Sequence, residues 1–123
     1  MRAILIDPHT RTVTEVDYNG EREGPDAASA STLIGCDITE ALALDVNIDE
    51  MYVDDIGKLR RERPPWFLTS LLRNDWICGR ALVVGRRDRH GHDTPPKLTL
   101  ERVRESISWA DIGCRQDHAV AGR

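Results

Sequence analysis

The sequence predicts a single small α+β domain, with a mostly antiparallel sheet of four to six strands and two helices on one face. Three observations predict this fold. The chain has 123 residues, which is enough for one core and too few for a two-domain enzyme. Short apolar runs alternate with turn residues along most of the chain, as in an antiparallel sheet. Two segments carry the capping residues and apolar content of a helix.

The first strands are predicted at the N-terminus. Ala3 to Ile6 is apolar, and Thr12 to Tyr18 is rich in Thr, Val and Tyr. Asp7 and Pro8, which lie between the two runs, favour a turn. We therefore expect a β-hairpin, with its first strand in a central position of the sheet because that strand is apolar on both faces.

A short helix and two further strands complete the first half. Pro25 and Asp26 open the helical segment, which ends at Gly35. Glu40 to Asn47 alternates apolar and polar residues like a half-buried strand, although its Glu, Ala and Leu residues also suit a helix. Met51 to Asp54 predicts another strand, which the Asp-Asp-Ile-Gly sequence ends in a turn.

The second half begins with a segment that two structures would fit. Trp66 to Leu72 is apolar and suits either a strand or a single helical turn. Gly79 to Arg86 is a clearer strand, because it is rich in β-formers and bounded by glycine. Trp66, Trp76 and Trp109 are expected to fill the core, given the large area that each indole buries.

The C-terminal part predicts a loop, a helix and a tail. Arg86 to Pro96 is polar and predicts an exposed loop. Thr99 is placed to cap a helix that carries Leu100, Val103 and Ile107 on one side. We expect the domain to span residues 1–110 and residues 111–123 to form a flexible tail.

Cysteine usage and hydropathy favour a soluble protein of the bacterial cytoplasm. Cys36, Cys78 and Cys114 are odd in number and form no Cys-x-x-Cys pair, so we expect reduced thiols, of which Cys36 and Cys78, beside apolar residues, are buried and inert. No apolar run reaches the ~20 residues that a membrane span needs, and the N-terminus does not resemble a signal peptide.

The charge changes sign at one point of the chain. Residues 1–57 contain 13 acids and 3 bases, a net charge of −10, whereas residues 58–123 contain 8 acids and 14 bases, a net charge of +6. Such asymmetry favours a partner that is contacted through one sign of charge. The alternative is that the two halves fold together and their charges form ordinary surface ion pairs.

The acidic half contains a series that could imitate a phosphate backbone and occupy a basic groove on another protein. We predict that these acids form a partner-binding surface: Asp45, Asp49, Glu50, Asp54 and Asp55. The Asp54-Asp55 pair could also bind Mg²⁺ or act as plain turn residues.

Arginines and a tryptophan in the basic half offer an alternative site for an anionic nucleotide, because guanidinium forks suit phosphate and an indole can stack on a base. The residues are Arg60, Arg61, Trp66, Arg86 and Arg87, with Arg63 and Arg89 beside them. The chain has few aromatic residues, which argues against an extended stacking platform.

A histidine-rich loop is the remaining candidate. His90, His92 and Asp93 lie within four residues, near Asp88, a composition that a transition metal could accept. The spacing lacks the third histidine of a two-metal hydrolase, and a solvated loop explains the same residues. The sequence also contains no phosphate-binding loop and no hydrolase or metalloprotease motif. We therefore expect no metal, no cofactor and no catalytic residue.

Five segments together resemble a family of small bacteriophage and prophage proteins known only as a domain of unknown function. They are MRAILIDP with RTVTEVDYNG, LIGCDI, MYVDDIGKL, GRALVVG and LTLERVRESISW. The resemblance covers Met1 to Trp109 and implies an α+β fold and a mobile-element origin, with no established activity. The first helix and the segment between Trp66 and Gly79 depart from the family's pattern.

These observations lead to two hypotheses. In the first, the protein is a non-enzymatic accessory protein that binds and inhibits a host protein or protein–nucleic acid complex, in the manner of an anti-CRISPR, through its acidic surface. In the second, it is an oligomer that sequesters an anionic nucleotide through its arginines. The sequence does not distinguish a monomer from a homodimer.

Overall fold

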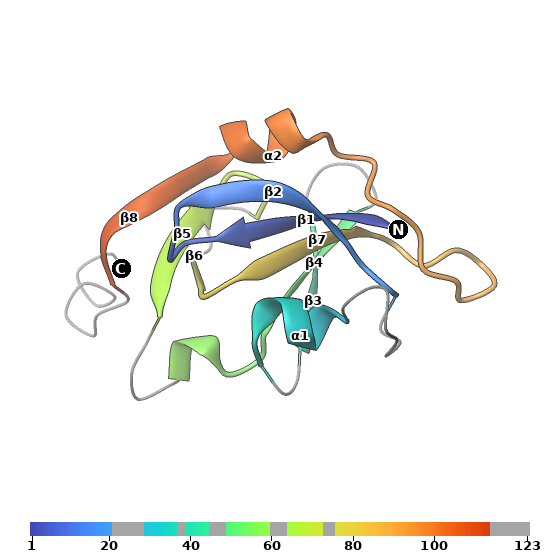
Figure 1. Ribbon diagram of the computed structural model, residues 1–123, viewed down its shortest axis with the longest axis horizontal. Coiled ribbons are helices and arrows are strands. Elements are labelled where there is room, and N and C mark those ends of the chain that lie inside the picture. The colour runs from blue at the N-terminus through green and yellow to red at the C-terminus, as the bar shows by residue number, and fades with distance from the viewer. Residues whose placement is uncertain (21–28, 37–38, 45–48, 60–63, 73–75, 114–123) are drawn as a thin grey trace.

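The computed structural model describes residues 1–20, 29–36, 39–44, 49–59, 64–72 and 76–113. These residues form two antiparallel sheets, two short α-helices and one 3-10 turn (Figure 1). The elements, in chain order, are β1 (Arg2–Asp7), β2 (Thr12–Asp17), α1 (Ala30–Ile34), β3 (Thr39–Ala43), β4 (Asp49–Asp54), η1 (Gly57–Leu59), β5 (Pro65–Thr69), β6 (Trp76–Cys78), β7 (Ala81–Gly85), α2 (Leu100–Glu105) and β8 (Ile107–Gly113). No helix in this part of the chain is long and apolar enough to span a membrane.

The larger sheet has the strand order β2-β1-β7-β4-β3, and every neighbouring pair is antiparallel. The predicted hairpin is confirmed, with β1 and β2 in register from Arg2 opposite Asp17 to Asp7 opposite Thr12. Its first strand lies between β2 and β7, as expected. β3 pairs with β4, so this segment is a strand and not a helix.

A second sheet, with the order β6-β5-β8, was not expected as a separate layer. The Trp66 to Leu72 segment contributes β5, so its strand alternative is the correct one. Phe67 of β5 lies opposite both Ile77 of β6 and Trp109 of β8, and all three side chains pack toward the core. The partners are far apart in the sequence, which is why local patterns did not reveal this sheet.

The larger sheet is covered on both faces. Ala81 and Val83 of β7 belong to one core cluster, whereas Leu82 and Val84 belong to the other. Val103 of α2 and the inward side chains of the smaller sheet join the first cluster. The buried side chains of α1 join the second. The two helices therefore contact opposite faces of the sheet, instead of the single face that we expected.

Helix α1 is short because capping residues define both of its ends. The Ser29 side chain accepts a hydrogen bond from the N–H of Thr32, and the helix begins at Ala30. Gly35 ends it with a φ of 84°, a left-handed conformation that glycine adopts without steric cost. The predicted end is confirmed, but the helix starts later than Pro25.

Helix α2 begins at the predicted cap, Thr99, and ends earlier than expected. The buried Ser106 hydroxyl lies 2.9 Å from the Thr69 hydroxyl of β5, which ties the end of the helix to the smaller sheet. Ile107 is not helical but begins β8, opposite Thr69. β8 continues to Gly113, past residue 110, where we expected the domain to end.

The three tryptophans have different environments. Trp109 packs against the core, with its ring centroid 6.0 Å from that of Phe67. Trp66 and Trp76 instead lie half-buried on the outer side of the smaller sheet, edge to face, with centroids 6.0 Å apart. Strand alternation explains the difference, because their neighbours Phe67 and Ile77 point inward. The expectation that all three indoles fill the core is wrong for these two.

The cysteines also differ from expectation. Cys78 is buried and disulfide-bonded, so the prediction of a reduced thiol is wrong at this position. Cys36 is not disulfide-bonded, as expected. Cys114 lies outside the described residues.

Candidate functional site

Asp49 belongs to the predicted acidic surface, but the fold buries it. Its side chain is 0% exposed and accepts hydrogen bonds from the N–H groups of Lys97 at 2.9 Å and Leu98 at 2.7 Å. A buried carboxyl group that satisfies two backbone donors has a structural role, here joining β4 to the segment that leads into α2. Asp49 therefore cannot contact a partner. Asp45 lies outside the described residues.

The other described acids of the series differ from Asp49 in their position and partners. Glu50 and Asp54 lie on the opposite side of β4 from Asp49, because side chains alternate along a strand. The Glu50 carboxylate lies 4.0 Å from Arg86, and Asp54 accepts a hydrogen bond from the N–H two residues on. Asp55 is exposed in the turn that follows.

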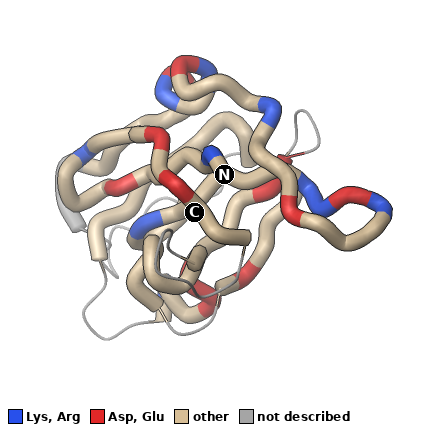
Figure 2. Tube along the Cα trace, turned by 45° about the vertical axis from the view of Figure 1, so that its right-hand side comes forward, with Lys and Arg blue, Asp and Glu red and all other residues tan. Residues whose placement is uncertain are grey.

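Charges of the two halves interleave in the folded chain. Asp7 of the acidic half forms an ion pair with Arg80 of the basic half, at 3.1 Å. Burial raises the pKa of Asp7, but hydrogen bonds from Arg80 and the His9 N–H outweigh burial, so this pKa lies below its ordinary value. Figure 2 shows basic and acidic segments intermixed along the described trace. The alternative of ordinary ion pairs is the correct one for these residues.

The predicted nucleotide-binding arginines are not brought together with Trp66. Arg86 faces Glu50, and Arg87 forms a 3.2 Å ion pair with Asp93, whose hydrogen bond and charge raise the pKa of Arg87. The segment after β7 and strand β5, which carries Trp66, lie at opposite ends of the molecule (Figure 1). Arg60, Arg61 and Arg63 lie outside the described residues.

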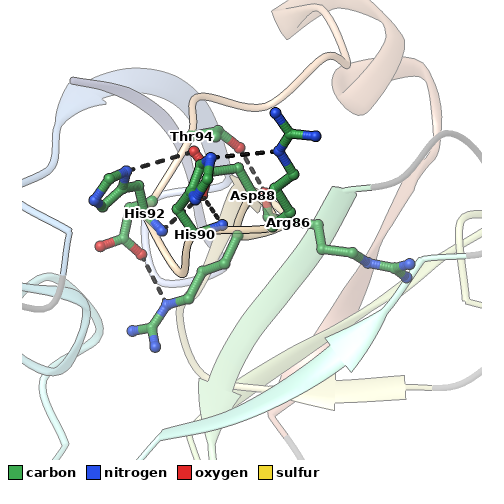
Figure 3. Close-up of polar contacts among 8 residues, drawn as sticks. Arg86, Asp88, His90, His92 and Thr94 are labelled. Carbon is green, nitrogen blue, oxygen red and sulfur yellow. Dashed lines mark hydrogen bonds and ion pairs between the residues drawn. The ribbon is translucent and has the colours of Figure 1, made fainter.

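The histidine loop is organised around Asp88 (Figure 3). Its carboxylate accepts hydrogen bonds from the N–H groups of His90 at 2.8 Å and His92 at 2.9 Å. The bond from the His92 N–H, followed by that from His90, lowers the pKa of Asp88. Within the described residues, no three His, Cys, Asp or Glu side chains are grouped to hold a metal ion. Asp88 therefore shapes a turn.

A hollow beside η1 brings together residues that the charge pattern alone did not identify. It has a volume of about 280 Å³ and lies between β3, β4, η1 and β6. Its walls include the apolar residues Leu42, Val53 and Ile77, and its rim includes Glu40 and Asp55. Asp54, Lys58 and Leu59 complete the side formed by the turn.

Two apolar side chains stand exposed on this turn. Leu59 is 79% exposed and Ile56 is 45% exposed. The sequence did not mark them, because isolated apolar residues in a charged segment carry no pattern. An exposed leucine beside a hollow with Leu42, Val53 and Ile77 in its walls is the surface feature that distinguishes this turn from the ion-paired regions.

The turn that carries Leu59 is held in place at several points. The Leu59 N–H donates to the Ile56 carbonyl at 2.9 Å. Gly57 lies so close to β6 that a Cβ would come within 2.9 Å of the Cys78 carbonyl oxygen. The Lys58 ammonium lies 4.4 Å from the centre of the Trp76 ring. The exposed side chains are thus presented from an ordered turn.

Comparison with known proteins identifies a family and no activity. A family model described as a domain of unknown function, DUF3846, matches residues 1–108. The chain belongs to this family. DUF3846 thus covers nearly the whole segment, Met1 to Trp109, over which we noted the resemblance. No curated protein and no solved structure matches the chain. The function of this DUF3846 chain must therefore be argued from its own residues.

Proposed function

We propose that this protein is a non-enzymatic binding protein of a mobile element, which inhibits a host protein by occupying its basic surface. The observation that carries the proposal is the ordered η1 turn, which exposes 79% of Leu59 beside a hollow that has apolar walls and charged residues around them. Interfaces are dominated by a few large side chains that enter pockets. Leu59 and Ile56 would supply such anchors, and the hollow would receive an apolar side chain of the partner.

The order of the turn supports this role. A partner that binds a preformed surface loses less conformational entropy than one that must first order a loop. The backbone bond at Leu59, the close approach of Gly57 to β6 and the Lys58–Trp76 contact all restrict the turn before any partner arrives. The turn thus holds Leu59 exposed before the partner protein binds.

Charge favours a basic partner. Glu40 and Asp55 are exposed at the rim of the hollow, and half-buried Asp54 lies beside them. Complementary charge at a rim accelerates association and excludes wrong partners more than it adds affinity. Proteins that handle nucleic acid carry basic surfaces because they neutralise phosphates. A host defence complex of this kind is the partner that we propose.

The proposal is tested with tagged protein and a lysate of the bacterial host, followed by titration of the captured partner in purified form. We expect a basic partner, and we expect Leu59→Ser to weaken the purified complex by tenfold or more, because this side chain anchors the contact. Asp55→Asn should slow association by a few fold and reduce the dependence of association on salt.

Glu101→Gln is the matched control, since Glu101 is an exposed acid on α2, and α2 contributes no residue to the lining of the hollow. It should leave binding unchanged. Leu59→Ser should leave the melting temperature unchanged, because the side chain is mostly exposed. The proposal would be contradicted if Leu59→Ser bound the captured partner as tightly as Glu101→Gln does, or if no basic partner were captured.

A further inference from the structure

A cleft of about 340 Å³ lies on another part of the molecule and is lined by residues of the edge strand β2, the turn before it, helix α2 and strand β8. Its lining consists of Arg11, Thr12, Val13, Thr14, Arg104 and Trp109. Three segments that are far apart in the sequence meet here. The cleft shares no residue with the η1 hollow.

Arg104 is fixed in the cleft by its own hydrogen bond. Its Nε donates to the carbonyl oxygen of Val13, on the open edge of β2, at 3.1 Å. This bond uses one of the five N–H donors of the guanidinium group. The two terminal nitrogens therefore remain for a ligand, in the planar arrangement that matches two oxygens of a phosphate or carboxylate.

Arg11 reaches the cleft from the turn between β1 and β2. One of its terminal nitrogens donates to the carbonyl oxygen of Ala110, on β8, at 2.9 Å. Arg11 has a φ of 54°, a left-handed conformation that is unfavourable for most residues other than glycine, asparagine and aspartate. The fold thus holds an arginine where glycine would fit more easily. Its remaining N–H donors are available to a ligand.

No acid whose side chain the structure describes neutralises either guanidinium group; the side chain of Asp111, which follows Ala110 on β8, lies outside this described part. Among the described side chains and backbone, the hydrogen bonds of Arg11 and Arg104 go to backbone carbonyls. The acid of β2 closest in sequence to the cleft, Glu15, forms an ion pair with Arg2. This distinguishes the cleft from the region of Arg86 and Arg87, where each arginine faces a carboxylate.

The open edge of β2 contributes a backbone donor. Tyr18 donates its N–H to the Met1 carbonyl, so the even-numbered residues of β2 bond to β1 and the odd-numbered ones face outward. The N–H and the carbonyl of Val13 therefore both point to the open edge. Because Arg104 occupies the carbonyl, this edge is not free to pair with an added peptide strand.

Trp109 provides a flat apolar wall to the cleft. Its indole is half-buried and is supported from behind by the edge-to-face contact with Phe67. An indole held in one orientation can pack against a planar ring, and such contacts accept different bases. The cleft thus combines two anion-binding groups with an aromatic surface, in a volume at the lower end of those that hold small ligands.

We propose that this cleft binds a mononucleotide, with its phosphate between Arg11 and Arg104 and its ring against Trp109. The two guanidinium groups and the Val13 N–H match the charge and the several oxygens of a phosphate better than those of a single carboxylate. The proposal is independent of the partner surface at η1, and it moves the nucleotide site away from Arg86 and Arg87.

This site is tested by titration of the full chain with adenosine monophosphate, in which tryptophan fluorescence and the melting temperature are measured. We expect the nucleotide to change the fluorescence and to raise the melting temperature, because it binds only the folded state. Inorganic phosphate should bind more weakly, and adenosine should not bind. Trp109→Phe should abolish the fluorescence change, whereas Trp66→Phe should retain it.

Arginine variants separate a built site from general attraction to a basic surface. Arg104→Gln should weaken nucleotide binding by roughly tenfold or more, because a charge-assisted hydrogen bond is lost. Arg102→Gln is the matched control, since it removes the same charge from an exposed position of the same helix and should change binding less than twofold. Equal losses in these two variants would overturn the proposal.

Arg11→Gly keeps the test independent of folding. Glycine adopts the backbone conformation of Arg11 without strain, so this variant should fold normally and still lose nucleotide binding. Full binding by folded Arg11→Gly would overturn the proposal. Equal binding of adenosine and its monophosphate, or binding of an oligonucleotide without the mononucleotide, would also overturn it.

Discussion

The η1 hollow and the β2–α2–β8 cleft differ in the state of their charges. The hollow has a volume of about 280 Å³, apolar residues in its walls and acidic residues at its rim, and an exposed leucine lies beside it. The cleft, of about 340 Å³, contains two arginines that bond only to backbone carbonyls in the described chain. The first surface suits a protein and the second suits a small anion.

The difference shows that the groups around a charged side chain decide whether it can bind a ligand, and that the net charge of a sequence segment does not. Residues 1–57 contain three basic residues, and one of them, Arg11, lines the cationic cleft. Conversely, Arg80 and Arg86 of the basic half face the carboxylates of Asp7 and Glu50. The net charge of a half therefore did not locate either surface.

The largest effect on stability is expected at Asp49, which joins β4 to the segment before α2, the helix that carries Arg104 of the cleft. Asp49→Ala leaves the Lys97 and Leu98 N–H groups without their acceptor. We expect a loss of roughly 3 kcal/mol or more in the free energy of unfolding, since each buried unsatisfied donor costs about 1–3 kcal/mol. Denaturant titration measures this loss.

Asp55→Ala is the control for Asp49→Ala, because Asp55 is exposed and should change stability by less than about 0.5 kcal/mol. As denaturant is added to Asp49→Ala, nucleotide binding should weaken at a lower concentration than partner binding through Leu59. Equal stability of the two variants would show that the Asp49 carboxyl group does not support the segment before α2.

A smaller effect is expected at Cys78, which lines the η1 hollow and is disulfide-bonded. Cys78→Ala should lower the free energy of unfolding by about 2–4 kcal/mol through loss of the cross-link. Thermal melts with and without a reducing agent measure this: reduction should lower the melting temperature of the wild type but not that of Cys78→Ala. Cys36→Ala, which removes the cysteine that is not disulfide-bonded, should still respond to reduction. A wild-type chain that reduction leaves unchanged would contradict this prediction.

The smallest effect concerns the Asp7–Arg80 pair, which joins the two halves. The pKa of Asp7 in the folded chain lies below its ordinary value of 3.8, so the stabilisation is fully present above that value and is lost as the pH falls through the folded pKa. Asp7→Asn should therefore destabilise the protein at neutral pH, by about 1 kcal/mol at most because solvent screens the 39% exposed Arg80.

At a pH below the folded pKa of Asp7, the melting temperatures of Asp7→Asn and the wild type should converge. Asparagine retains an acceptor for the His9 N–H, so the comparison isolates the charge. Arg80→Gln should show the same dependence on pH. A difference that persists unchanged at acid pH would show that the pair is not the cause.

Local sequence signals predicted the elements that local contacts determine. The turn at Asp7 and Pro8, the cap at Thr99 and the end of α1 at Gly35 all involve residues within a few positions of each other. β8 was missed because it depends on pairing with β5, some forty positions earlier. Without that pairing, the segment after Ser106 has too little apolar content to predict a strand.

The candidate sites were harder to predict for the same reason. Arg11 reaches the Ala110 carbonyl across 99 positions, and Arg104 reaches the Val13 carbonyl across 91. No spacing rule connects such residues. Asp49 illustrates the opposite error, since a carboxylate in an acidic series was expected to be exposed, and two backbone donors from a distant segment bury it.

The order of strands in the larger sheet bears on how the chain is made. β7 is the only element that joins the β1–β2 hairpin to the β3–β4 hairpin in the described sheet, and it is the last of the five to leave the ribosome. Until Gly85 has been synthesised, the edges of β1 and β4 that will pair with β7 remain open, in addition to the outer edges of β2 and β3. A nascent chain halted before β7 would therefore expose two additional strand edges to chaperones and proteases.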